Sequence, residues 1–188
     1  MPMPPLPDLS GLSLADIARM AAERRLPPVD QWHPDRSGDS EMRIAADGSW
    51  YHQGDRIERP EMVRLFATIL RREADGSHVL VTPAERLSIA VEDAPFVAVE
   101  LKSECEGDAR RLAFRLNTGD LVIAGPAHEL SVVEREDGPH PYLHVRGGLR
   151  ALIARPLFYE LAEIAIAEGQ TPAGVWSDGA FFALEPVA

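Results

Sequence analysis

Two matching segments, Ile57-Glu58-Arg59-Pro60 and Ile153-Ala154-Arg155-Pro156, decide how this 188-residue chain is expected to fold. Each follows an expected strand and a glycine turn, and each proline suits the first position of a helix, where its missing N–H is not needed. Leu65 and Leu161 stand at the same offset in the two copies. Proline at a helix start is also common in unrelated proteins. The repeated order of elements nevertheless predicts a duplicated core, in which two related lobes are each closed by a helix.

The larger lobe is expected in residues 76–188. Between residues 79 and 145 apolar side chains recur at alternate positions, as in Val97, Val99 and Leu101. Turn residues separate about seven such segments, and this regular spacing is typical of a small antiparallel barrel or sandwich. The second Ile-x-Arg-Pro segment then begins the closing helix.

The smaller lobe is expected in residues 1–75. Ser13-Leu14-Ala15-Asp16 matches a capping box and predicts a docking helix. Asp47-Gly48 between short apolar segments predicts a hairpin. A helix then starts at Pro60 and ends at Asp75-Gly76. Its apolar stripe is predicted to consist of Met62, Leu65, Phe66 and Ile69. The fold class is therefore α+β.

The chain is acidic, with 19 Lys and Arg residues against 30 Asp and Glu residues and a formal charge of −11. Binding to a nucleic-acid backbone is not expected, because such proteins present a net basic face. A local group of arginines is still compatible with one small anion. No signal peptide is recognisable, and no apolar run approaches the length of a membrane span. The single cysteine cannot form an internal disulfide, so we expect a cytoplasmic protein.

Motifs of familiar chemistry are missing from the sequence. There is no Gly-x-x-x-x-Gly-Lys phosphate loop, no Gly-x-Gly-x-x-Gly segment and no Gly-x-Ser-x-Gly elbow. The six histidines lack the spacing of a His-Glu-x-x-His site. The sequence therefore predicts no metal site and no catalytic constellation, and it indicates no particular cofactor.

Polar residues gather at the expected strand ends. Glu92 and Asp93 stand where the strand alternation breaks before Pro95, which cannot donate to a sheet. Their carboxylates suit sugar hydroxyls or an arginine, and Trp50 offers an aromatic face for a base. The predicted ligand-binding residues are Trp50 and His52 in the first lobe and Thr82, Glu92, Asp93, Phe96, Asn117, His128 and Arg146 in the second.

Each candidate also has a structural interpretation. Thr82 fits the cap of a turn, Asn117 fits a hairpin loop, and His128 fits an exposed loop. The planar guanidinium of Arg146 suits a phosphate or a carboxylate, but an ion pair with Glu92 or Asp93 is an equal alternative.

Several of these stretches carry a family resemblance. Residues 47–54 (DGSWYHQG), 65–73 (LFATILRRE), 80–85, 91–96, 117–120 and 142–149 resemble the uncharacterised bacterial family catalogued as domain of unknown function 1285. The resemblance covers roughly residues 26 to 187. It implies a duplicated core, a second lobe superficially like a pleckstrin-homology domain, and a cleft between the lobes that takes a nucleotide-like ligand in signalling. No enzymatic activity is implied. This chain departs from the family pattern at Arg56 and at His128-Glu129-Leu130, where the family usually has Pro and His-Pro-Leu.

The leading hypothesis is a regulatory protein that binds a nucleotide-like small ligand between its lobes, since ligand sites favour domain interfaces. One alternative is a protein-interaction module that takes a peptide at an exposed strand edge or groove. The other is a hydrolase that uses Glu92, Asp93 and His128, which requires the three side chains to converge on one cavity.

Overall fold

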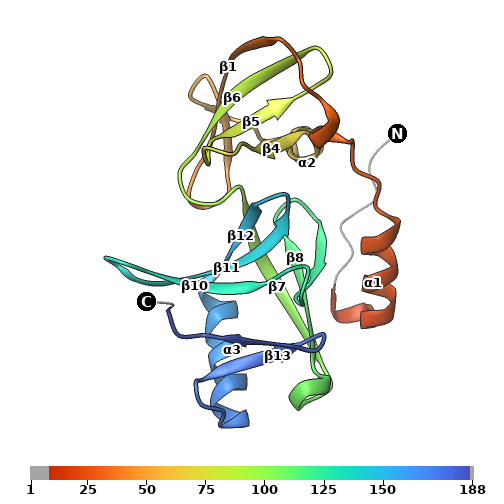
Figure 1. Ribbon diagram of the computed structural model, residues 1–188, viewed down its shortest axis with the longest axis vertical. Helices are drawn as coiled ribbons and strands as arrows, with labels where there is room; N and C mark the ends of the chain where they lie inside the picture. Colours follow the sequence, from red (N-terminus) through yellow and green to blue (C-terminus); the bar gives the residue numbers. More distant parts are fainter. Residues whose placement is uncertain (1–8, 187–188) are drawn as a thin grey trace.

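The computed structural model describes residues 9–186 and arranges them as two lobes (Figure 1). A six-stranded sheet forms the first lobe, in the order β3-β2-β1-β6-β5-β4. Its strands are β1 (Arg36–Ile44), β2 (Trp50–His52), β3 (Asp55–Arg56), β4 (Leu70–Arg72), β5 (His78–Val81) and β6 (Glu85–Val91). Helix α2 (Pro60–Thr68) connects β3 to β4. The hairpin expected across Asp47-Gly48 is confirmed by the antiparallel pairing of β1 with β2.

A second six-stranded sheet forms the other lobe, in the order β10-β11-β12-β7-β8-β9. Its strands are β7 (Phe96–Glu104), β8 (Arg111–Leu116), β9 (Leu121–Ile123), β10 (Leu130–Arg135), β11 (Gly138–Arg146) and β12 (Leu149–Ile153), with a 3-10 turn, η3 (Gly107–Ala109), after β7. Helix α3 (Arg155–Glu168) and the hairpin of β13 (Gly174–Ser177) and β14 (Ala180–Ala183) lie on the side away from the first lobe (Figure 1). The α+β class and the two-lobe architecture are confirmed.

The two sheets have the same topology. In each lobe the first and last strands of six lie side by side in the centre, and the remaining strands run outward from them. The central pair is parallel in both cases: β1 with β6, and β7 with β12. The core is therefore duplicated as expected, but the second sheet is neither wholly antiparallel nor a closed barrel, since β10 and β9 form open edges.

The two Ile-x-Arg-Pro segments do begin helices, but these helices are not equivalent. Helix α2 follows the third strand of its sheet, whereas α3 follows the sixth strand of the other. The structural repeat is the order of strands, and the matching tetrapeptides occur at different places within it. Proline at the first turn of a helix is sufficient to explain both segments.

The boundary between the lobes lies later than the sequence suggests. Strands β5 and β6, residues 78–91, pair with β4 and β1 in the first sheet. The boundary therefore falls in the linker between β6 and β7, and not after residue 75. The helix expected at 60–75 is also shorter, because it ends at Thr68 and the chain continues as β4. Asp75-Gly76 is the turn of the β4–β5 hairpin.

The apolar stripe expected on this helix is only partly buried. Met62 is 39% exposed and Leu65 is 64% exposed, whereas Ala67 is fully buried. The helix is too short for the predicted stripe to reach Ile69, which is its C-cap residue. The buried side of α2 instead centres on Ala67, with Val63 and Phe66 packed at the margin of the core.

The N-terminal helix packs on the second lobe and not on the first. Helix α1 (Leu14–Glu23) has the expected capping box, in which Ser13 and Asp16 exchange hydrogen bonds with each other's backbone N–H. Leu14 and Ile17 are buried against Ala113 of β8. Two 3-10 turns, η1 (Leu9–Gly11) and η2 (Val29–Gln31), flank it. Within residues 9–186, no helix is long and apolar enough to cross a membrane.

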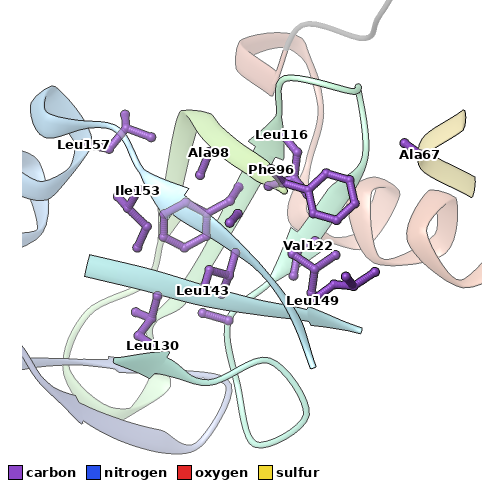
Figure 2. Close-up of a cluster of buried hydrophobic side chains, with 14 of the residues drawn as sticks. Ala67, Phe96, Ala98, Leu116, Val122, Leu130, Leu143, Leu149, Ile153 and Leu157 are labelled. Carbon is purple, nitrogen blue, oxygen red and sulfur yellow. The ribbon is translucent and has the colours of Figure 1, made fainter. Parts of the chain in front are cut away.

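One apolar core runs through both lobes. The main cluster joins Trp50 and Leu70 of the first sheet to Phe96 and Phe114 of the second. Figure 2 shows Phe96 beside Leu116 and Val122, with Ala67 of the first lobe at the edge of the same cluster. The lobes therefore share a continuous interior at their junction.

Candidate functional site

The lobes meet along a seam that polar side chains of the second lobe bridge. Asn117 donates from Nδ2 to the carbonyl oxygen of Gly48, 3.3 Å away, while its Oδ1 accepts from a backbone N–H of its own lobe. Arg146 donates to the carbonyl oxygen of Ala67 at 2.8 Å, and its guanidinium carbon lies 5.3 Å from the ring centre of Phe96. Burial lowers the pKa of Arg146. Three predicted residues, Phe96, Asn117 and Arg146, thus lie at the seam, where they join the lobes.

A pocket of about 260 Å³ opens at one end of the seam, and we call it the Trp50 pocket. The first lobe contributes its walls through the β1–β2 turn, β3 and the start of α2, and the second lobe through the β8–β9 turn. It is lined by Asp47, Gly48, Ser49, Trp50, Arg56, Ile57, Glu58, Pro60, Val63, Arg64, Asn117 and Thr118.

Trp50 forms a wall of this pocket and not a free stacking surface. Its side chain is 1% exposed, and its ring stacks on Phe66 with 6.5 Å between centroids. The expected stacking of a base on Trp50 therefore does not fit this arrangement. Its indole Nε1 is buried and has no hydrogen-bond partner among residues 9–186.

Three arginines gather behind the Trp50 pocket. Burial and the nearby charges of Arg146 and Arg64 lower the pKa of Arg24. Arg24 forms an ion pair with Asp120, whose other carboxylate oxygen accepts from the Thr118 hydroxyl at 2.9 Å. Neither Arg64 nor Arg146 has an ion-pair partner in the described part of the chain. Of the three arginines only Arg64 lines the pocket, where Arg56 and Arg64 face Asp47 and Glu58.

A second pocket, of about 330 Å³, lies at the opposite end of the first sheet, and we call it the Arg72 pocket. It is lined by Arg72, Gly76, Ser77, His78, Ile89, Val91, Asp93, Pro95, Gly148 and Arg150. Burial, followed by the charges of Arg72 and Arg150, lowers the pKa of His78. The two pockets share no lining residue.

The comparisons with known proteins fit this two-lobe arrangement. The model of the N-terminal domain of DUF1285, a domain of unknown function, matches residues 27–94, and the model of the C-terminal domain of DUF1285 proteins matches residues 95–184. The chain belongs to the DUF1285 family. The family boundary at residues 94 and 95 coincides with the linker between β6 and β7.

Two solved DUF1285 structures are similar to this protein. One, from Silicibacter pomeroyi DSS-3, is 41% identical with a TM-score of 0.79, and the match covers 91% of this chain and 95% of that one. The other, from Shewanella baltica OS155, is 26% identical with a TM-score of 0.52 over 65% of this chain and 90% of that one. No curated protein gives a significant match.

The adjacent carboxylates of Glu92 and Asp93 point to different partners in this DUF1285 protein. Glu92 accepts from Arg43 and from the backbone N–H of Ala46, so it is tied to the first lobe. Asp93 accepts from the Tyr142 hydroxyl at 2.6 Å, so it is tied to the second. Of these two carboxylates, Asp93 lines the Arg72 pocket, whereas Glu92 lines neither pocket.

The remaining predicted residues lie outside both seam pockets. Thr82 accepts backbone N–H bonds from Ala84 and Glu85 and so caps a turn. His52 is exposed at the end of β2. The His128 ring lies 3.2 Å from the carbonyl oxygen of His144 and stacks on its ring.

Sequence reasoning missed the two arginines of the Arg72 pocket. Arg72 fell within the helix expected at 60–75, whereas it lies on β4, and Arg150 drew no attention because a single arginine in a strand carries no motif. The available signal was the pair of arginines in 146–150, a stretch that contains no acidic residue. Their convergence depends on strand pairing between distant segments.

Proposed function

We propose that this DUF1285 protein is a regulatory protein that binds a nucleotide-like small molecule in the Trp50 pocket. The main support is the composition of that pocket. Residues of both lobes line it, and they provide an apolar wall, arginines and carboxylates. Small-molecule sites are typically apolar hollows with a few convergent polar groups.

The parts of the pocket suit the parts of such a ligand. Ile57 and Val63 offer apolar surface to a base, while Asp47 and Glu58 are placed to accept from ribose hydroxyls. Arg64 offers a guanidinium to phosphate, which matches its planar geometry. The N-terminus of α2 lies at the pocket as well, and its dipole favours an anion there.

A regulatory role follows from the place of the pocket. A ligand that touches the β1–β2 turn and the β8–β9 turn interacts with both lobes at once. Such a ligand biases whichever arrangement of the seam it binds more tightly. No step of chemistry is required of the protein.

The test is a thermal-shift screen of mononucleotides with three proteins: the wild type, Arg64→Gln and Arg59→Gln. Arg59 is the matched control, because it is the N-cap residue of the helix that carries Arg64 but does not line the pocket. We expect at least one nucleotide to raise the melting temperature of the wild type and of Arg59→Gln, and to raise that of Arg64→Gln by less than half as much. Equal shifts in all three proteins, or no shift in the wild type, would refute the proposal.

The two alternatives receive less support. A strand-edge interaction is less favoured at three of the four sheet edges, because β9 contacts α1, β10 contacts β14 and β4 contacts η2, and the fourth edge strand, β3, has only two residues. A hydrolase requires convergence, yet neither seam pocket is lined by more than one of Glu92, Asp93 and His128. The likeness of the second lobe to a pleckstrin-homology domain and the cytoplasmic location stay predictions.

A further inference from the structure

The Arg72 pocket is a separate hollow with its own chemistry. Strands β4, β5 and β6 of the first lobe form one side, and the β11–β12 turn with the start of β12 forms the other. The Trp50 pocket is reached from β2 and β3, at the far end of the same sheet. The two pockets therefore share no residue, and a ligand in one does not occupy the other.

Two of its cations have no carboxylate partner within residues 9–186. Arg72 comes from the first lobe, and its closest polar contact is a long one, 3.5 Å from Nη1 to the carbonyl oxygen of Gly148. Arg150 comes from the second lobe, and its guanidinium carbon lies 4.0 Å from the ring centre of Tyr142. A guanidinium over an aromatic ring keeps its charge and its outward N–H donors. Two positive charges from different lobes thus face one hollow.

The carboxylate that lines the pocket does not neutralise them. Asp93 accepts from the Tyr142 hydroxyl at 2.6 Å and from Arg135 at 3.2 Å through the same oxygen. Its charge is therefore balanced by Arg135, which does not line the pocket. The pocket lining therefore carries two guanidinium groups against one carboxylate, and that carboxylate already has an ion-pair partner outside the pocket.

Two glycine turns lie beside Arg72. A Cβ added to Gly76 would lie 3.5 Å from Arg72 Nη2, and one added to Gly148 would lie 3.4 Å from Arg72 Cδ. The exposed Arg72 side chain thus lies close to both the β4–β5 turn of the first lobe and the β11–β12 turn of the second.

The pKa of His78 is lowered partly by the positive charges of the pocket. Burial is the first cause of its lowered pKa, and the charges of Arg72 and Arg150 are the next. Both arginines therefore lie close enough to act on the same imidazole. A neutral His78 still offers one N–H donor to an acidic ligand.

We propose that the Arg72 pocket binds the phosphate group of a small phosphomonoester. Two unbalanced guanidinium groups match a phosphate, whose charge of about −1.5 to −2 exceeds that of a single carboxylate. Arginine also presents paired donors to phosphate oxygens. The volume of about 330 Å³ exceeds the need of a bare phosphate and leaves room for an organic part against Ile89, Val91 and Pro95.

The bound phosphate bridges the lobes at the end of the seam opposite the Trp50 pocket. Arg72 belongs to the first sheet and Arg150 to the second. Each arginine supplies part of the counter-charge, so loss of either is expected to weaken binding and loss of both to remove it. This site does not depend on the nucleotide proposal, because it uses different residues.

Binding is measured by isothermal titration with ribose 5-phosphate, inorganic phosphate and succinate at low ionic strength. The proteins are the wild type, Arg72→Gln, Arg150→Gln and their double variant, together with Arg64→Gln from the Trp50 pocket and Arg36→Gln as control. Arg36 lies in the same sheet, its side chain is 80% exposed, and it lines neither pocket. Each single pocket variant should weaken ribose 5-phosphate by about tenfold or more, whereas Arg36→Gln should not.

The wild-type protein supplies a second readout. Saturation with ribose 5-phosphate should raise the pKa of His78 in an NMR titration, because the phosphate cancels the field of the two arginines. The ester should bind more tightly than inorganic phosphate or succinate. Undiminished binding by the double variant, an unmoved His78, or tighter binding of succinate would each overturn the proposal. Loss of the ester by Arg64→Gln with no loss by Arg72→Gln would assign the phosphate to the Trp50 pocket instead.

Discussion

Replacement of Gly48 by alanine should weaken the seam, and the same replacement at Gly54 is the matched control. Both glycines have φ of 86° and lie in neighbouring hairpin turns of the first sheet. Only their surroundings differ. A Cβ at Gly48 would lie 2.6 Å from Asn117 Nδ2 and 2.9 Å from Val97 Cγ2, whereas a Cβ at Gly54 would meet no atom within 4 Å.

The expected magnitudes follow from this geometry. Left-handed backbone costs an alanine about 1–2 kcal/mol at either position. At Gly48 the methyl group also displaces the Asn117 amide, whose hydrogen bond to the Gly48 carbonyl is worth about 0.5–1.5 kcal/mol. Crowding of a packed interface adds about 1–3 kcal/mol. We therefore expect Gly54→Ala to lower the free energy of unfolding by about 1–2 kcal/mol and Gly48→Ala by about 3–6 kcal/mol.

The assay is urea unfolding followed by tryptophan fluorescence, with the free energy of unfolding extrapolated to water. The dependence on urea concentration should be the same in both variants, so that the difference in free energy reflects stability alone. Equal losses in Gly48→Ala and Gly54→Ala would show that the close approach of the second lobe at Gly48 carries no energy. The account of the seam given above would then be wrong.

Three further predictions concern single contacts. Burial and then the contact with Asp93 raise the pKa of Tyr142 from 10.0 to about 12. The contribution of the neutral Tyr142 to the free energy of unfolding is therefore fully present below pH 10.0 and is lost as the pH rises toward 12. Tyr142→Phe should flatten that alkaline loss in urea titrations, and an unchanged slope would contradict it. Ser13→Ala removes a helix cap and should cost about 1 kcal/mol of unfolding free energy, with Ser13→Asp as the tolerated control. Glu168→Gln breaks a 2.7 Å pair with Arg110 whose side chains are 14% and 11% exposed, and should cost about 3 kcal/mol at neutral pH. Because the hydrogen bond from Arg110 lowers the pKa of Glu168, wild-type stability should fall more steeply through acid pH than that of the variant, which keeps the other carboxylates of lowered pKa.

Local chemistry predicted the local structure well. The capping box at Ser13 and the Asp47-Gly48 hairpin were confirmed because both depend on residues within a few positions of each other. Asp75-Gly76 carries the same turn signal but was assigned to a helix end. A glycine at positive φ serves both a hairpin turn and a helix C-terminus, so only the pairing of β4 with β5 decides between them.

Long-range pairing is what the sequence did not disclose. The parallel pairs of β1 with β6 and of β7 with β12 join the ends of each lobe, and no periodicity in the chain encodes them. The boundary error followed directly, since β5 and β6 resemble the strands that come after them. The matching Ile-x-Arg-Pro segments then gave the duplication the wrong alignment, although a duplication is present.

A few of the residues singled out from the sequence line the pockets between the lobes, although their role as ligand-binding residues stays a prediction. Trp50 and Asn117 line the Trp50 pocket and Asp93 lines the Arg72 pocket, because strand ends and turns of both lobes meet there. Arg64, Arg72 and Arg150 were missed, since an arginine becomes notable only when no carboxylate lies near it in space. Arg146 was expected to bind a phosphate or a carboxylate through its planar guanidinium, yet it donates to the backbone carbonyl of Ala67 in the other lobe.

The continuous core changes the expected action of a ligand at the seam. A hinged cleft would have to expose residues such as Trp50 and Phe96, which are at most 1% exposed and belong to one apolar cluster. Exposure of one large aromatic side chain costs on the order of 4–6 kcal/mol, by the area it buries. A ligand bound in either pocket would therefore act on a closed seam, by linking turns that already lie together. The two pockets use opposite halves of each sheet: the Trp50 pocket is lined from β2, β3 and the β8–β9 turn, and the Arg72 pocket from β4, β5, β6 and the β11–β12 turn.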